Sequence, residues 1–321
     1  MRKRLKQFCG GITFNDFCNK ICKCEYAKAN VFVGRQQYDR YIDHAVINKS
    51  TYIYNMYPET DELHREKIQN HAVTYIGSLV PTKGFHVLAA VWKTILKEVP
   101  DATLNVVGNG KLYGRNSKLG KYNIAEDSYE KQFMPGLTDD EGNILPSVHF
   151  WGVLGVEKND VIRNTCVGVV NPTGRTETFG ISALDFESMS VPVVTIAKGG
   201  FLDTVLNEKT GLLYGHTDDF AKDIIMLLKN DKLNEQYGRD GVQLCKKFTP
   251  DKIIKEWNRL FLKVLNDEKM EYIEPDSFME TNLKKYRCLN RKIKNAIGIE
   301  YPISVIGAES FARNVLRRMG K

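Results

Sequence analysis

The sequence predicts an α/β protein built on a doubly wound parallel sheet. From about Ala72 onward, short runs of β-branched residues alternate with segments of helical periodicity, which is the pattern of parallel strands joined by crossover helices. Glycines follow several of these runs, at the points where a strand would turn into a helix. The chain has 321 residues, 42% of them hydrophobic, which is enough for about two domains with hydrophobic cores.

The elements of this sheet are expected in chain order. Leu88, Trp92 and Ile95 recur at helical spacing until Pro100, which ends a helix. Strands are expected at 73–76, 103–107, 148–150, 166–170, 192–196 and 210–214. Helices are expected at 88–99, 157–164, 181–190 and 202–206, and over most of 218–267. The polar segment 109–146 is too long for an ordinary connection, so we expect a lid or a small subdomain there.

The regions on either side of the sheet look different. Residues 1–71 hold only a fragment of the alternation, with strands at 30–34 and 51–54 around a helix at 35–44. We therefore divide the chain into three ranges. These are a partial N-terminal Rossmann-like piece with a linker at 1–71, a Rossmann-like domain at 72–267, and a basic helical C-terminal extension at 268–321.

The positive charge of the chain lies near its C-terminus. The formal net charge is +7, but residues 281–321 carry ten Lys or Arg against two Glu, which is a local +8 and leaves about −1 for residues 1–280. Such a tail could rest on anionic lipid or on a partner, or it could be a solvated helix face. No DNA- or RNA-reading motif accompanies the charge, so nucleic-acid binding is not expected.

Apolar runs and cysteines bear on the location of the protein. A membrane-spanning helix needs about 20 apolar residues, and the longest apolar runs, such as 166–170, are far shorter. The basic start is not followed by the apolar stretch of a signal peptide. Seven cysteines, an odd number, fit reduced thiols better than a disulfide framework. We expect a cytoplasmic protein, with peripheral contact at the inner face of a membrane through the basic tail as an option.

Four cysteines cluster near the N-terminus, at Cys9, Cys18, Cys22 and Cys24. Their spacing does not match the paired C-x2-C arrangement of zinc sites, so we place half-buried thiols or loop cysteines ahead of a metal site. We expect no bound metal and no cofactor.

A turn that could bind an anion runs from Gly77 to Gly84, between the first strand of the sheet and its helix. Such a turn presents backbone N–H groups and the positive helix end to a phosphate, and Lys83 adds a full charge. The spacing of a P-loop is absent. A solvated lysine in an ordinary turn remains the alternative interpretation.

Gly108 and Gly110 follow the second strand of the sheet and resemble part of a dinucleotide fingerprint. The third glycine falls at Gly114, one residue too late, and no helical period opens behind it. A dehydrogenase is therefore disfavoured.

The most informative stretch runs from Asn171 to Val194. A strand leads into a glycine-containing loop that carries Glu177, and a helix follows that carries Asp185, eight residues further on. Open α/β sheets bind ligands at this end of their strands, and two carboxylates there can hydrogen-bond to different parts of a polyhydroxylated ligand. The alternative is that these acids are surface groups near the start of a helix.

This stretch resembles the donor-binding signature of the family-4 retaining glycosyltransferases of GT-B fold. Glu177, Phe179, Gly180 and Pro192 fall in register with that signature, and Asp185 stands at the position of its second acid as a shorter carboxylate. The Gly77 to Gly84 turn is similar to the family's phosphate-binding turn, although Ser78 replaces an arginine often found there. The resemblance covers about residues 72–267.

The resemblance implies a metal-independent hexosyl transfer from a nucleotide-sugar, UDP- or GDP-linked, to a glycan or lipid-linked acceptor with retention, in polysaccharide or glycoconjugate synthesis. It implies that Lys83 and Glu177 are catalytic, with Lys83 on the diphosphate and Glu177 on the sugar hydroxyls. The donor-binding residues that it implies are Gly77, Ser78, Gly108, Gly110, Thr178, Phe179, Gly180 and Asp185.

One departure from the family opens a second interpretation. Only about 70 residues precede the donor domain, where the family carries a full acceptor domain. The alternative function is therefore a donor-binding remnant or subunit that needs a partner for transfer.

Overall fold

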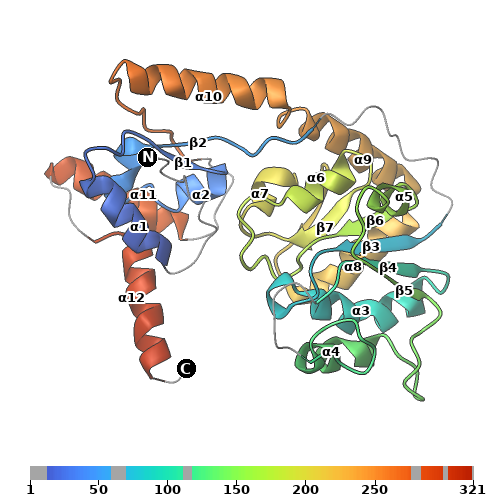
Figure 1. Ribbon diagram of the computed structural model, residues 1–321. Coiled ribbons are helices and arrows are strands. Elements are labelled where there is room, and N and C mark those ends of the chain that lie inside the picture. The colour runs from blue at the N-terminus through green and yellow to red at the C-terminus, as the bar shows by residue number, and fades with distance from the viewer. Residues whose placement is uncertain (1–12, 59–69, 111–117, 276–282, 299–302, 320–321) are drawn as a thin grey trace. The chain divides into compact units, whose positions relative to one another are not determined.

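A computed structural model describes residues 13–58, 70–110, 118–275, 283–298 and 303–319, and the chain forms two compact units (Figure 1). The sheet unit comprises Tyr57–Thr249, and the terminal unit combines Met1–Met56 with Pro250–Lys321. Helix α10 (Pro250–Leu265) belongs to the terminal unit because it buries Ile253 and Leu260 against Ile53. The boundaries of these compact units differ from the predicted ranges 1–71, 72–267 and 268–321. Those ranges remain a prediction about functional domains.

The sheet unit is built on a six-stranded sheet in which every pairing is parallel. The strand order is β5-β4-β3-β6-β7-β8. The strands are β3 (Ala72–Ile76), β4 (Thr103–Val107), β5 (Val148–Gly152), β6 (Val167–Val169), β7 (Val193–Ile196) and β8 (Gly211–Tyr214). The chain winds outward from β3 to β5, then returns to the other side of β3 and winds outward again. This order confirms the predicted doubly wound, Rossmann-like sheet.

Helices cover both faces of this sheet, as Figure 1 shows. Alternate residues of each strand point to opposite faces. Val194 and Leu212 pack in one cluster with residues of α3 and α8, whereas Val193 packs with α6 and α7 in another. The helices of the unit are α3 (Phe85–Glu98), α4 (Asp127–Phe133), α5 (Lys158–Arg163), α6 (Ile181–Glu187), α7 (Phe201–Thr204), α8 (Thr217–Lys229) and α9 (Asp231–Cys245).

The described part of the long segment 109–146 is folded onto the sheet unit. Tyr129 and Phe133 of α4 are buried, and the Phe133 ring packs edge-on to Phe85 of α3. The buried carboxylate of Glu130 accepts hydrogen bonds from the backbone N–H groups of Tyr122, Ile124 and Ala125. The described residues thus share the hydrophobic core of the sheet unit, and a lid or subdomain role for them stays a prediction.

The terminal unit joins short elements from both ends of the chain. Strands β1 (Asn30–Phe32) and β2 (Ser50–Tyr52) form a parallel two-stranded sheet. Around them lie α1 (Thr13–Lys23), α2 (Arg35–Asp39), α10, α11 (Lys284–Ile297) and α12 (Val305–Arg318). The expected helical tail is confirmed. No helix in the described ranges is long and apolar enough to cross a bilayer.

Candidate active site

The candidate site lies where the winding direction of the sheet reverses, between β3 and β6. These strands are neighbours, with Tyr75 opposite Val169. Because both strands run in the same direction, the turn after β3 and the loop after β6 leave the same edge of the sheet side by side. Ligands of open α/β sheets bind at this reversal point.

The turn after β3 places Lys83 immediately before α3. The backbone N–H of Gly77 donates to the Val107 carbonyl at 3.1 Å, which ties the start of the turn to β4. A short 3-10 helix, Pro81–Lys83, ends the turn. The Tyr75 hydroxyl donates to the carbonyl of Lys83 at 2.9 Å, so a buried strand residue fixes the backbone of this lysine. Ser78 is half-buried in the same turn.

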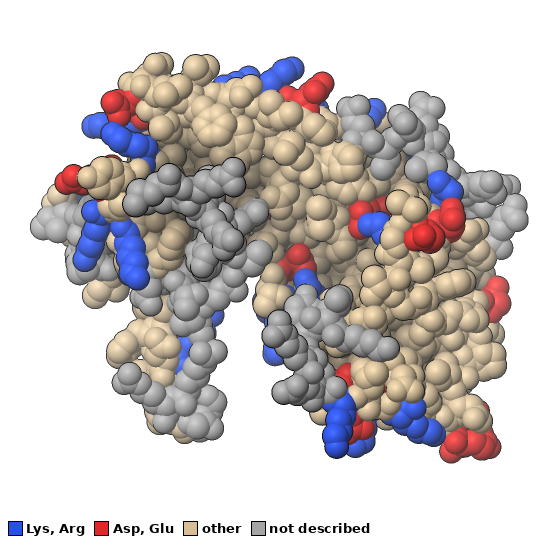
Figure 2. Space-filling model, viewed as in Figure 1, with Lys and Arg blue, Asp and Glu red and all other residues tan. Residues whose placement is uncertain are grey.

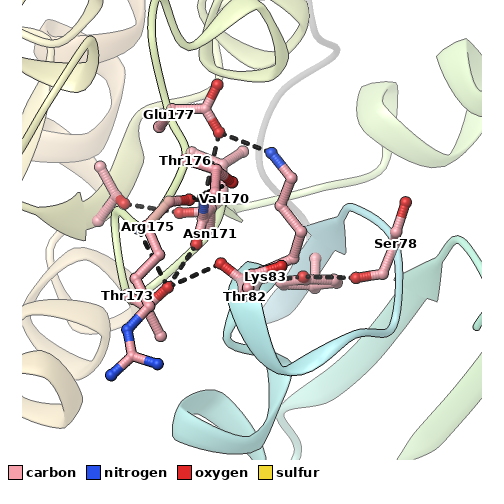
Figure 3. A network of polar contacts seen from close by, with 11 residues as sticks. Ser78, Thr82, Lys83, Val170, Asn171, Thr173, Arg175, Thr176 and Glu177 are labelled. Carbon is pink, nitrogen blue, oxygen red and sulfur yellow. Dashed lines mark hydrogen bonds and ion pairs between the residues drawn. The ribbon is translucent and has the colours of Figure 1, made fainter. Parts of the chain in front are cut away.

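The loop after β6 brings Glu177 to Lys83 (Figure 3). Lys83 Nζ lies 2.9 Å from Glu177 Oε2, and the two side chains are 28% and 12% exposed. Asn171 Nδ2 donates to the same carboxylate oxygen at 3.2 Å and to the Arg175 carbonyl at 2.9 Å. An ammonium group and a carboxylate therefore meet at the reversal point of the sheet. The sequence identified both residues as site residues but did not predict their contact.

Thr173 connects the loop to the turn. Its hydroxyl lies 2.9 Å from the Thr82 carbonyl and 2.9 Å from Asn171 Oδ1, so it can donate to either oxygen (Figure 3). Asn171, Thr173, Thr82 and Lys83 thus form a polar network around Glu177. The network holds the carboxylate in place from both segments.

Gly108 and Gly110 shape the next turn. Gly108 has φ +133°, and a Cβ atom there would lie 2.1 Å from the Gly77 carbonyl oxygen, so no other residue fits at this close approach. Gly110 is buried, and its N–H donates to Ile124 at 3.0 Å. Both glycines bring the turn after β4 against the turn after β3.

Thr178, Phe179 and Gly180 lead from Glu177 into α6. Phe179 is buried, and its ring packs edge-on against Phe248. Gly180 has φ +89°, in the left-handed region, and stands at the N-terminus of α6. Thr178 is half-buried beside them.

Asp185 belongs to a second polar cluster. Its Oδ2 lies 2.7 Å from Lys158 Nζ at the start of α5, and its Oδ1 accepts a hydrogen bond from the Tyr57 hydroxyl at 3.1 Å. The Tyr57 hydroxyl also lies 3.1 Å from Ser188 Oγ. Burial and the neighbouring Asp185 charge raise the pKa of Tyr57, so Tyr57 is a neutral donor at neutral pH.

Several residues of the site were missed at the sequence level. Asn171 and Thr173 stand in the quoted signature stretch, directly behind a strand, where polar residues could have been picked out. Lys158 is the second residue of the predicted helix 157–164 but has no partner nearby in sequence. Tyr57 and Tyr75 carry no signal in the sequence at all.

The described part of the chain contains no group of three or more His, Cys, Asp or Glu side chains placed to hold a metal ion. Cys18 is buried, Cys22 is half-buried and Cys24 is exposed, and Cys9 lies outside the described residues. Burial raises the pKa of the Cys18 thiol to about 12, so this thiol is protonated at neutral pH.

A doubly wound parallel sheet with a cation and carboxylates at its reversal point defines a class of protein that binds a ligand outside the carboxyl ends of its strands. The family follows from the sequence profile. The profile named "Glycosyl transferases group 1" matches residues 58–243, more than half of the chain. The chain belongs to this family.

Curated relatives agree with this assignment. An uncharacterised glycosyltransferase of Methanocaldococcus jannaschii is 25% identical over 215 residues, which are 66% of this chain and 53% of that protein. The capsular polysaccharide biosynthesis glycosyltransferase CapM of Staphylococcus aureus is 26% identical over 56% of this chain and 43% of its own length. The chain thus spans about half the length of the curated relatives it matches.

Solved structures share the fold. HepE of Anabaena, in complex with UDP, has a TM-score of 0.62 at 16% identity, over 81% of this chain and 70% of that chain. TarM of S. aureus has a TM-score of 0.61 at 17% identity, over 77% of this chain and 46% of that chain. These likenesses confirm the predicted GT-B glycosyltransferase fold.

Proposed function

We propose that the sheet unit binds a nucleotide-sugar and that the protein transfers the sugar to a glycan or lipid-linked acceptor in polysaccharide or glycoconjugate synthesis. The observation that carries this proposal is the contact of Lys83 with Glu177 at the reversal point of the sheet. This contact places a cation that can bind a diphosphate next to a carboxylate that can bind sugar hydroxyls.

Lys83 acts on the leaving group in this proposal. Transfer breaks the bond between the anomeric carbon and the oxygen of the terminal phosphate, and the electron pair leaves with the nucleoside diphosphate. The acceptor oxygen forms the new bond to the anomeric carbon, and its proton passes to an oxygen of the departing diphosphate. Lys83 Nζ, which is part-exposed, turns from Glu177 to the diphosphate and stabilises the charge that develops there.

The other residues bind the donor. Glu177, held by Asn171, accepts hydrogen bonds from the sugar hydroxyls, while the backbone of Thr178, Phe179 and Gly180 borders the sugar. Asp185 gives up its contact with Lys158 and accepts hydrogen bonds from the ribose hydroxyls. Gly77 and Ser78 border the diphosphate, and Gly108 and Gly110 leave room for the nucleoside beside them.

Solved relatives support the choice of ligand. The HepE structures are described as complexes with UDP, with UDP and glucose, and with UDP-glucose, and one TarM structure contains UDP. These ligands belong to those proteins, and they favour a uridine nucleotide as the first donor to test on this chain.

Retention at the anomeric carbon and independence from metal are also part of the proposal, and both rest on the family resemblance. Retention is tested by NMR of the product, in which the anomeric configuration must equal that of the donor. Metal independence is tested with EDTA, which must leave the transfer rate unchanged.

A donor-binding subunit is the second candidate function. The observation in its favour is that the described part of the terminal unit contains a sheet of two strands, against six in the sheet unit. Under this proposal the chain binds the donor but transfers nothing without a partner that supplies the acceptor site.

Two experiments separate these candidates. A thermal-shift panel with UDP, GDP and ADP and their sugars tests binding, because a ligand at 100 times its Kd stabilises a fold by about 2.7 kcal/mol. Radiolabelled donors with a panel of lipid and glycan acceptors then test transfer. Binding with transfer supports the first candidate, binding without transfer supports the second, and no thermal shift with any nucleotide-sugar contradicts both.

A cytoplasmic location completes the proposal. Its support is the seven cysteines noted above. Cell fractionation with markers for the cytoplasm and for membranes tests this location.

A further inference from the structure

Helix α11 turns its charged face inward. Lys284 Nζ lies 2.6 Å from Asp39 Oδ2, and Lys294 donates to the carbonyl of Asp43 at 2.7 Å. Arg287 is fully buried and contacts Glu309 at 2.7 Å. Lys284, Arg287 and Lys294 therefore attach the helix to the rest of the terminal unit, whereas Lys285 and Lys292 remain on the solvated side considered from the sequence.

The opposite face of α11 is apolar and exposed. Tyr286, Leu289, Ile293 and Ile297 recur at intervals of three and four residues, which places them on one face of the helix. Their exposed fractions are 65%, 55%, 41% and 52%. We call these four residues the α11 stripe. It spans 12 residues, and its two ends lie about 16 Å apart at the rise of an α-helix.

The surroundings of the α11 stripe carry positive charge. Helix α11 contains no acidic residue, and Lys285 and Lys292 are exposed next to the stripe. Helix α12 carries exposed Phe311 and Leu316, and its exposed Arg313 lies 3.7 Å from Glu309. In Figure 2, Lys and Arg side chains project from the surface of the terminal unit, with a few Asp and Glu side chains beside them.

We propose that the α11 stripe docks on an anionic lipid surface. An amphipathic helix in this position places its apolar side chains about 5–10 Å into the boundary between headgroups and acyl chains. Exposed lysines beside the stripe then meet anionic headgroups, each contributing to binding. The protein thus lies on the membrane through a helix that is fixed to its own fold by buried charges.

The charge pattern favours a lipid surface over a second copy of the chain. Two α11 stripes that faced each other would bring lysines of like charge together around the contact, which opposes association. An anionic membrane has the complementary sign. The proposal is independent of sugar transfer, because it concerns only the terminal unit.

Co-sedimentation of the full chain with lipid vesicles tests the proposal. One set of vesicles is pure phosphatidylcholine, and the other contains about one third phosphatidylglycerol as the anionic lipid. We expect binding to the anionic vesicles, weak binding to the neutral ones, and a decrease as salt is raised.

Substitutions in the α11 stripe identify the surface responsible. Ile293→Ser is expected to lower the partition coefficient about fivefold, and the double change Leu289→Ser with Ile293→Ser about twentyfold or more. Lys292→Glu is expected to lower it about tenfold on anionic vesicles only. The matched control is Met226→Ser on α8, because Met226 is 42% exposed against 41% for Ile293.

The outcomes are distinct. An unchanged melting temperature shows that the variants still fold, as expected for exposed positions. Equal binding of Ile293→Ser and the unchanged chain, or no binding to anionic vesicles at all, overturns the proposal. A dimer in light scattering that the double change dissolves also overturns it, and assigns the α11 stripe to a second copy.

Discussion

Lys83 and Glu177 lie 94 positions apart in the sequence, and their side chains meet at 2.9 Å because their strands are neighbours in the sheet. Lys83→Ala removes the cation that we assign to the leaving diphosphate. We expect transfer or donor hydrolysis to fall about 10²–10³-fold in kcat, the loss seen when one charge-stabilising donor is removed from an active site. Rates measured with saturating donor check this.

Lys131→Ala is the matched control for that change, since Lys131 is an exposed lysine of α4 paired with Asp127. A Lys83→Ala protein that keeps the full rate would remove Lys83 from the mechanism. A similar loss in both variants would point to a general effect of lysine removal.

Asn171 is expected to position Glu177. Asn171→Asp keeps the size of the side chain but replaces the Nδ2–H donor with a like charge beside Glu177. We expect the free energy of unfolding to drop by about 1–3 kcal/mol and the KM for the donor to rise. The control is Asn123→Asp, because Asn123 is exposed and has a positive φ of 57°, as Asn171 has one of 29°. Equal effects in both proteins would show that Asn171 matters only for its backbone conformation.

Asp185 is expected to recognise the ribose. Asp185→Asn should weaken the binding of a ribonucleoside diphosphate about tenfold or more, because hydrogen bonds to a charged group contribute about 1.5–3 kcal/mol. Binding of the 2′,3′-dideoxy analogue should change little, since it lacks the hydroxyls. Calorimetry with both ligands measures the difference, and a parallel loss for both ligands would argue against a ribose contact.

Glu187 is expected to make stability depend on pH. Its carboxyl group is fully buried, accepts a hydrogen bond from Thr210 at 2.6 Å, and has its pKa raised well above the usual value by burial. The unfolded chain loses this proton near pH 4.3, whereas the folded chain keeps it, so its contribution is full below that pH and declines as pH rises toward the folded pKa. The decline is at most about 1.4 kcal/mol per pH unit.

Urea unfolding at several values between pH 4.5 and pH 8 measures this slope. Glu187→Gln cannot ionise, so we expect the variant to lose that part of the pH dependence. Asp160→Asn is a control, because Asp160 is an exposed acid on α5. If Glu187→Gln keeps the slope of the unchanged protein, Glu187 is not its source.

Gly108→Ala tests the close approach of two turns. A Cβ atom at Gly108 would lie 2.1 Å from the Gly77 carbonyl oxygen, and φ is +133° there. We expect a loss of about 2–4 kcal/mol in the free energy of unfolding, together with weaker donor binding. Gly215→Ala is the control, because a Cβ atom there meets nothing within 4 Å. A Gly108→Ala protein of unchanged stability would show that the turns can separate at no cost.

Much of the fold was predictable because strands and turn glycines leave local patterns. The strand predicted at 103–107 is found with the same bounds as β4. The helix predicted at 181–190 ends earlier, at Glu187, since Ser190 adopts a positive φ of 61°. Helix α1 was not predicted, and it is buried through Cys18 against residues of other elements.

The site was only partly predictable, because its contacts depend on packing between distant segments. Lys83 and Glu177 each stand in a recognisable stretch, so both could be named from the sequence. The contact of Lys158 with Asp185 depends on how α5 packs beside α6, and no spacing rule gives that distance. The inward charges of α11 were missed because the positions of lysine and arginine in the sequence do not show which face of a helix packs against the rest of the protein.

The pairing of β3 with β6 also limits what variation can change. The chain between Lys83 and Asn171, which includes β4, α4 and β5, returns in β6 to the strand position beside β3. Residues gained or lost in the connections of this stretch, outside its helices and strands, would therefore leave the lysine beside the carboxylate. Length changes in those connections are thus separated from the contact between Lys83 and Glu177, which depends on the pairing of β3 with β6.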